Sequence, residues 1–133
     1  MWTYSQKTGD LLRNGRIIAT GYSGCDDGKN NPSMQAVHEV GPIPQGNWII
    51  SGPPRNTERH GPYVLTLNPA IGTNAFGRSG FLMHGDSVTA CGTASKGCVI
   101  LPRNAREQIW NSGDRDLEVV PESAIHDVPD QNA

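Results

Sequence analysis

The sequence predicts a single, mainly β domain, because the chain is short, rich in turn formers and patterned in short apolar runs. Its 133 residues suffice for one hydrophobic core of ordinary size. The 16 glycines and 10 prolines follow no fixed period, and only 35% of the residues are hydrophobic. This composition favours short strands joined by many turns over a helical bundle.

The N-terminal part predicts a small meander followed by a long loop. Short apolar runs cover residues 2–5, 10–13 and 16–20. Asn14-Gly15 separates the last two runs and is a strong hairpin signal, since both positions tolerate positive φ. Residues 21–36 are polar and glycine-rich, and a loop of this length in a small domain is often functional.

The rest of the chain predicts further strands and one helix. A rigid turn over 41–46 feeds a strand that Pro53-Pro54 is expected to end. The helix is predicted over 102–111, because Ala105, Ile109 and Trp110 share one face and Gly113 can end it. The predicted strands lie at 47–51, 63–67, 81–84, 99–101 and 117–120. We therefore expect a β-sandwich or mixed-sheet domain over residues 1–120, with one helix after Cys98 and a mobile tail over 121–133.

Charge and hydropathy exclude several function classes. A net charge of −2, with Lys and Arg scattered along the chain, gives no electrostatic footprint for nucleic acid. No apolar stretch approaches the length of a transmembrane helix. Residues 1–20 carry Lys7, Asp10, Arg13 and Arg16 and so lack the apolar core of a signal peptide. If the protein works outside the cytoplasm, we expect other machinery to deliver it.

The three cysteines allow two interpretations. Cys25 and Cys91 could pair in an oxidising compartment and leave Cys98 free, or all three could be reduced thiols, two of them packing residues. The spacing of Cys and His gives no zinc-site signal, so we expect neither a metal nor another cofactor.

Cys98 and His84 are the strongest candidates for chemistry. His84 closes one predicted strand, and Cys98 opens another after a Ser-x-Gly turn. A histidine can take the proton that a thiol must lose to become a nucleophile, and Gly97 would let a substrate carbonyl approach the backbone. We predict a cysteine enzyme with Cys98 as nucleophile and His84 as base. A cysteine that only packs in the core is the competing interpretation.

Several side chains near this pair are candidates for substrate binding. Asp86 could orient His84 or only form a turn, and a backbone carbonyl could orient the ring equally well. Lys96 could lower the thiol pKa, bind a substrate carboxylate, or be a solvated loop residue. His38 and His60 flank proline–glycine turns and are expected to face solvent. The full set of predicted substrate-binding residues is Tyr22, Ser23, Gly85, Asp86, Ser95 and Lys96.

The segment from His84 to Leu101 resembles the catalytic motif of the L,D-transpeptidase (YkuD-type) family, a His-Gly strand end followed by Ser-x-Gly-Cys. The match is closer to the DUF2778 group, which includes the Tlde1-type effectors of type VI secretion systems. Five segments carry it: Tyr22-Ser23-Gly24, Asn30-Asn31-Pro32, Gly41-Pro42-Ile43-Pro44, Arg78 to Asp86, and Ala94 to Cys98. Two positions depart from the broader family: Lys96 stands where histidine is usual, and Ile100 where arginine is common.

The resemblance implies acyl transfer on peptidoglycan stem tetrapeptides. Cys98 would attack the carbonyl at the L-centre of meso-diaminopimelate, with backbone N–H groups around Gly97 and Cys98 stabilising the oxyanion. Water would complete an L,D-carboxypeptidase reaction and a D-amino acid an exchange, with crosslinking ranked last. An antibacterial effector acting in the target-cell periplasm is implied, with an immunity protein as partner. A thiol acyltransferase or peptidase on another substrate, and a wall-binding β-domain with an inert Cys98, are the rival interpretations.

Overall fold

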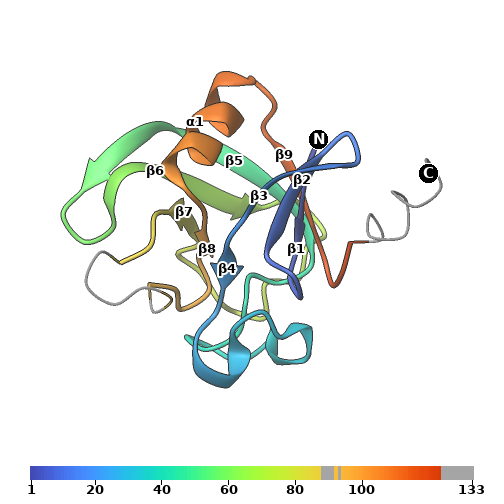
Figure 1. Cartoon of the computed structure of the whole chain (residues 1–133). Helices are drawn as coiled ribbons and strands as arrows, with labels where there is room; N and C mark the ends of the chain where they lie inside the picture. Colours follow the sequence, from blue (N-terminus) through green and yellow to red (C-terminus); the bar gives the residue numbers. More distant parts are fainter. Residues whose placement is uncertain (88–91, 93, 124–133) are drawn as a thin grey trace.

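A computed structural model describes residues 1–87, 92 and 94–123 of the chain. It confirms the mainly β prediction: the described residues form one mixed nine-stranded sheet with a single α-helix (Figure 1). The strands are β1 (Trp2–Ser5), β2 (Asp10–Arg13), β3 (Arg16–Thr20), β4 (Tyr22–Ser23), β5 (Gly46–Thr57), β6 (Gly61–Pro69), β7 (Leu82–His84), β8 (Val99–Ile100) and β9 (Asp116–Val120). The helix α1 spans Arg103–Asn111, and two short 3-10 helices cover Asp26–Gly28 and Pro32–Met34.

The strand order forces the sheet to curl. The order is β3-β2-β1-β9-β5-β6-β7-β8-β4, so β3 and β4 lie at its two ends. Only Gly21 separates these strands along the chain, and Figure 1 shows them approaching each other. Gly21 passes so close to β8 that a Cβ on it would lie 1.6 Å from the carbonyl oxygen of Ile100. A glycine is therefore required where the sheet returns on itself.

The N-terminal meander forms as predicted. β1 pairs with β2 and β2 with β3, both antiparallel. Asn14 and Gly15 have φ of 52° and 76°, the left-handed geometry that the Asn-Gly turn predicts. The final strand, β9, inserts between β1 and β5, parallel to β1 and antiparallel to β5.

The prediction that Pro53-Pro54 ends its strand is wrong. β5 continues through both prolines to Thr57 and pairs with β6 as a long hairpin. Between the pairs Ser51↔Thr66 and Arg55↔Val64 the register shifts, so three residues of β5 face one residue of β6. Proline has no N–H to donate, and this bulge places both prolines where no ladder hydrogen bond is needed.

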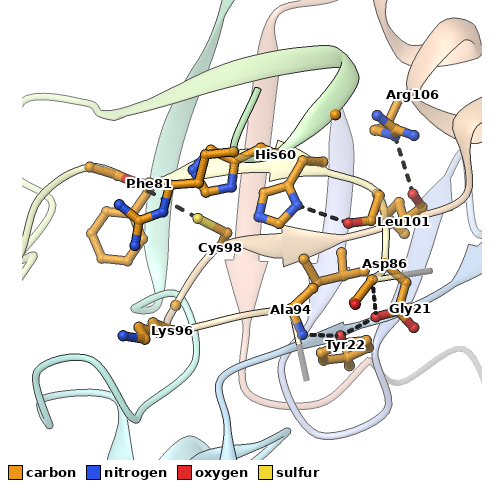
Figure 2. Close-up of a pocket in the computed structure, with 18 of the residues that line it drawn as sticks. Gly21, Tyr22, His60, Phe81, Asp86, Ala94, Lys96, Cys98, Leu101 and Arg106 are labelled. Atoms are coloured by element: carbon orange, nitrogen blue, oxygen red, sulfur yellow. Dashed lines mark hydrogen bonds between the residues drawn. The ribbon is translucent and has the colours of Figure 1, made fainter. Parts of the chain in front are cut away.

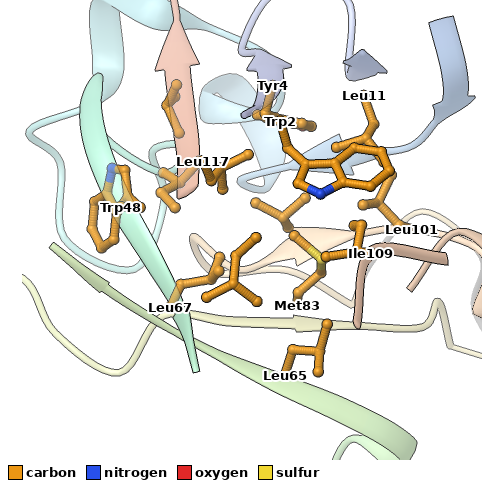
Figure 3. Packing of buried hydrophobic residues seen from close by; sticks show 14 of the residues in the cluster. Trp2, Tyr4, Leu11, Trp48, Leu65, Leu67, Met83, Leu101, Ile109 and Leu117 are labelled. Atoms are coloured by element: carbon orange, nitrogen blue, oxygen red, sulfur yellow. The ribbon is translucent and has the colours of Figure 1, made fainter. Parts of the chain in front are cut away.

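The core lies inside the curled sheet and is closed by α1. Trp2, Tyr4 and Trp48 are fully buried, together with aliphatic side chains from β6, β7 and β9 (Figure 3). α1 contributes Ala105 and Ile109, as the predicted face requires, whereas Trp110 is only partly buried. The core therefore fixes β7 and β8, the two strands that carry the predicted catalytic pair.

The first three residues of the predicted tail contact the domain. The amide of Lys7 donates to the carbonyl of Pro121, and the amide of Ser123 donates to the hydroxyl of Ser5. Residues 121–123 therefore lie against the domain. The remainder of the predicted tail, 124–133, falls outside the described residues.

Candidate functional site

One large open cavity, of about 1320 Å³, contains both residues of the predicted catalytic pair. Its walls come from the β3–β4 junction, the β5–β6 hairpin, β7 and β8 with their loops, and the start of α1. Figure 2 shows Cys98 and Lys96 on one part of the wall and Tyr22 and Asp86 on another. This volume exceeds the roughly 300–1,000 Å³ that is usual for small-molecule pockets, so the cleft has room for an extended peptide.

Two neighbouring parallel strands position the pair. β7 pairs with β8 in the register Met83↔Val99 and His84↔Ile100. His84 is the last residue of β7, and Cys98 immediately precedes β8. The two side chains therefore reach the cavity from adjacent strands, each anchored by a buried neighbour in the core.

The hydrogen bonding of His84 leaves one ring nitrogen as a base. Its Nδ1 lies 2.9 Å from the carbonyl oxygen of Gly85, so Nδ1 must carry the proton and donate it. In the neutral ring Nε2 is then an acceptor, and this buried atom has no partner in the described part of the chain. The orienting group is thus a backbone carbonyl and not Asp86.

The surroundings of His84 keep its ring neutral. Burial lowers the pKa of His84, the Gly85 carbonyl acts in the opposite direction, and the charges of His60 and Arg106 lower the pKa further. The ring of His60 packs against that of His84, with centroids 4.5 Å apart and planes tilted by 37°. A neutral histidine is the form that can accept a thiol proton.

Cys98 is half-buried and holds a protonated thiol at rest. Burial raises the pKa of the Cys98 thiol, while a backbone hydrogen bond at Leu82 and the charges of Arg59 and Arg78 act in the opposite direction. The sulfur lies 3.9 Å from the carbonyl oxygen of Gly80. The thiol therefore needs a base to become a nucleophile, and His84 Nε2 is the candidate base in the same cavity.

Arg78 fixes the turn before Cys98. Its buried guanidinium donates to the carbonyl oxygens of Gln35, Gly41, Pro42 and Lys96. Gly97 has φ of +134°, and a Cβ there would lie 2.5 Å from Arg78 Nη2. Glycine at position 97 is therefore needed for the close approach of this arginine, as well as for the backbone conformation.

The structure corrects the expected roles of Ser23 and Ser95, which are fully buried and do not line the cavity. The Ser95 hydroxyl donates to the carbonyl of Cys98 and accepts from the amides of Gly24 and Gly97. The Ser23 hydroxyl donates to the carbonyl of Gly97 and accepts from the amide of Ile43. Both serines therefore fix the turn at Gly97 and Cys98 through hydrogen bonds to its backbone. Because the Gly97 amide is bonded to Ser95, it is not free to bind an oxyanion, contrary to expectation.

Asp86 and Tyr22 line the cavity, but their polar groups bind one another. The Tyr22 hydroxyl donates to Asp86 over 2.6 Å and accepts from the amide of Ala94. Burial raises the pKa of Asp86, but hydrogen bonds from Tyr22 and from the amides of Gly92 and Ser87 hold it below its ordinary value. Asp86 therefore acts as an anchor for the loop that leads to Cys98, in line with the turn-former interpretation.

Gly85 and Lys96 also line the cavity, and they differ in what they can contact. A Cβ on Gly85 would lie 3.0 Å from Arg106 Nη2, so Gly85 makes room for a buried arginine. The Lys96 side chain is exposed and points away from Cys98 in Figure 2. Ile100, the other departure from the L,D-transpeptidase pattern, is buried.

Sequence reasoning missed the contribution of the β5–β6 hairpin. His60 was expected to face solvent, yet it is half-buried, lines the cavity and packs on His84. Arg59 lines the cavity beside it. Neither lies in a recognisable motif, and only the length of the hairpin, which runs past Pro53-Pro54, brings them to the site. His38 is exposed as predicted, and it too lines the cavity.

Cys25 is a free thiol whose sulfur donates to the carbonyl oxygen of Glu39. Cys91, its possible disulfide partner, lies outside the described residues. Across residues 1–87, 92 and 94–123, no group of three or more His, Cys, Asp or Glu side chains is placed to hold a metal ion. No described helix is both long and apolar enough to cross a membrane.

Comparison with known families gives one match. A family model described as the Tlde1 domain matches residues 17–122, a range that runs from the second residue of β3 past the end of β9 and includes both His84 and Cys98. The match is consistent with a type VI effector family. A search of curated proteins found no match to this chain.

Proposed function

The chain belongs to the Tlde1 domain family, and from this premise we propose that it is a cysteine enzyme of the L,D-transpeptidase type that acts on peptidoglycan stem tetrapeptides. The proposed reactions are L,D-carboxypeptidase cleavage and D-amino-acid exchange. The proposed setting is the periplasm of a target cell, where an antibacterial effector would meet stem peptides. The proposed partner in the producing cell is an immunity protein that blocks the cavity.

The observation that carries the proposal is the state of His84. Its Nδ1–H is committed to the Gly85 carbonyl, and its Nε2 is a buried acceptor without a partner among the described residues. A buried acceptor of this kind carries an energetic cost unless a donor reaches it. The Cys98 thiol, whose pKa burial raises and whose sulfur lies 3.9 Å from the carbonyl oxygen of Gly80, is the candidate donor in the same cavity. This pairing favours acyl transfer over a packing role for Cys98.

In the proposed acylation step, His84 Nε2 takes the thiol proton as Cys98 sulfur attacks the carbonyl carbon at the L-centre of meso-diaminopimelate. The Cys98 N–H is the candidate oxyanion donor, because the Gly97 N–H is already bonded to Ser95. Collapse of the tetrahedral intermediate breaks the C–N bond. His84 then returns its proton to the nitrogen of the departing D-alanine, and a thioester remains on Cys98.

In the proposed deacylation step, the acceptor enters where D-alanine left. Water that loses a proton to His84 attacks the thioester, releases the tripeptide acid and restores the thiol. A free D-amino acid attacking through its amine regenerates a tetrapeptide with a new C-terminal residue. The two outcomes differ only in the acceptor, so one constellation of Cys98 and His84 serves both.

The test is incubation of the protein with purified disaccharide tetrapeptide, followed by mass spectrometry. Loss of one alanine supports carboxypeptidase action, and a shift to the mass of an added D-amino acid supports exchange. Cys98→Ala serves as the inactive control. If folded wild-type protein leaves the tetrapeptide unchanged with and without D-amino acids, the substrate assignment is wrong. Retained binding to intact sacculi would then indicate a wall-binding domain.

A further inference from the structure

Five arginine and lysine side chains line the cavity, and three of them are already hydrogen-bonded or ion-paired to other groups of the protein. Arg78 donates to four backbone carbonyls, and Arg106 donates to the carbonyls of Leu101, Pro62 and Tyr63. Arg103 is paired with Glu107 over 3.1 Å. Arg59 and Lys96 remain, and neither side chain makes a hydrogen bond or ion pair with any residue that the structure describes. The cavity thus offers two uncommitted cations.

These two cations act on different parts of the molecule. The charge of Arg59 lowers the pKa of the Cys98 thiol and the pKa of His60, whose ring packs against that of His84. The charge of Lys96 acts on Cys25 instead, and its side chain points away from Cys98 (Figure 2). Arg59 is therefore the uncommitted cation associated with the catalytic pair.

We propose that Arg59 binds the terminal carboxylate of the substrate and so restricts the enzyme to donors and acceptors that end in a free carboxylate. This inference rests on the proposed function. In a stem tetrapeptide the carboxylate of D-alanine lies one residue beyond the carbonyl that Cys98 attacks. A free D-amino acid presents the same carboxylate next to its attacking amine. One cationic group near Cys98 can therefore serve both half-reactions.

The chemistry of Arg59 suits this role. A guanidinium presents two parallel N–H donors to a carboxylate, which fixes the orientation of the bound group as well as its charge. The Arg59 side chain is exposed and lines the cavity, so an incoming carboxylate can reach it. Arg59 lies beside His60 in the β5–β6 hairpin, and His60 packs on His84. A carboxylate bound by Arg59 would therefore be held by the same hairpin that contacts the proposed base.

The test compares the tetrapeptide with its C-terminal amide, on wild type and on Arg59→Gln. For the acid substrate, Arg59→Gln should lower kcat/KM roughly 10- to 100-fold, the size of one charge-assisted interaction, mainly by raising KM. For the amide, wild type and variant should be equally slow. Arg59→Lys should recover part of the loss on the acid. Arg55→Gln is the matched control, because Arg55 is exposed on the same hairpin and does not line the cavity.

A second measurement uses wild type alone. D-Alanine and D-alaninamide are offered as exchange acceptors, and D-alanine should be preferred by a similar factor. Equal use of both acceptors, or an equal loss on acid and amide in Arg59→Gln, would overturn the role of Arg59 while leaving the proposed function intact. Inactivity of wild type on both donors would overturn the proposed function and this inference with it.

Discussion

Two Gly–Cys pairs in this chain, Gly24–Cys25 and Gly97–Cys98, are built alike and surrounded differently. Both glycines have positive φ, +92° and +134° respectively. Both glycine amides donate to the same hydroxyl, that of Ser95. Both thiols are half-buried, and burial raises the pKa of each. The local backbone therefore does not distinguish a nucleophile from an inert cysteine.

The difference lies in what the two thiols face. Burial raises the pKa of Cys25 most, and the charges of Asp26 and Glu39 raise it further. The charge of Lys96 acts in the opposite direction. Around Cys98 the neighbouring charges are Arg59 and Arg78, which favour the thiolate. Only Cys98 shares its cavity with His84. The proposed reactivity of Cys98 therefore rests on the histidine and the cations that the fold places around it, and Cys25 is an internal control for this proposal.

The largest effect expected from this comparison is on catalysis itself. Cys98→Ala should lower D-alanine release from tetrapeptide by at least about 1000-fold, because no thioester can form. Cys25→Ala should retain activity close to wild type, since its thiol does not line the cavity. D-alanine release by Cys98→Ala at a rate close to wild type, or a matching loss in Cys25→Ala, would remove the distinction.

Substitution of the base should separate the two thiols by chemical reactivity. His84→Gln keeps a polar side chain but no base, and should slow tetrapeptide cleavage by about 100- to 10,000-fold. Alkylation with iodoacetamide at neutral pH, read by peptide mass spectrometry, should be faster at Cys98 than at Cys25 in wild type. In His84→Gln the Cys98 rate should fall and the Cys25 rate should not change. Slow and equal labelling of both thiols in wild type would refute the assignment.

Loss of the Ser95 hydroxyl should destabilise the turns at both Gly–Cys pairs, because the amides of Gly24 and Gly97 both donate to it. Ser95→Ala leaves two buried amides without their acceptor and should lower the free energy of unfolding by about 2–4 kcal/mol. Ser33→Ala is the matched control, because that hydroxyl is exposed. The measurement is chemical denaturation, with alkylation of each cysteine below the transition. An unchanged midpoint in Ser95→Ala would show that the two turns do not depend on this residue.

The smallest expected effect is on pH dependence. The active form of His84 is neutral, and burial lowers its pKa, so the acid limb of kcat/KM should fall below the ordinary range of histidine. His60 and Arg106 act in the same direction, whereas Asp86 acts against them. His60→Gln removes one positive neighbour, which raises the pKa of His84. The acid limb should therefore move to higher pH, and a shift to lower pH would contradict this account.

The local patterns in the sequence were sufficient for most of the strands and for placing Cys98 and His84 at strand ends. They were not sufficient for β4, which lies in the predicted loop over 21–36, or for the second half of β5. Each of the correct predictions rests on neighbours within a few residues: an Asn-Gly turn, a strand end, a glycine before a cysteine. The errors concern contacts between distant segments. Ser95 was expected in the cavity because it lies in the motif with Cys98, and Ser23 because it lies beside Tyr22 in a separate segment. The hydroxyls of both are used by backbone groups from other loops. His60 reaches His84 only because β5 bulges at its prolines instead of ending there.

The hydrogen bonds that fix the turn at Gly97 and Cys98 join segments that are far apart in the sequence. The turn can therefore form only after these segments have come together during folding. The Ser23 hydroxyl and the Gly97 carbonyl are separated by 74 residues along the chain, and Gly24 and Ser95 by 71. β9, near the end of the described chain, must insert between β1 and β5 before the sheet is complete. Such long-range pairing makes folding slow, because loop-closure entropy is lost before the contacts form. In a nascent or incompletely refolded chain we therefore expect Cys98 to be an ordinary thiol, and the proposed reactive centre to form only once β9 has joined the sheet.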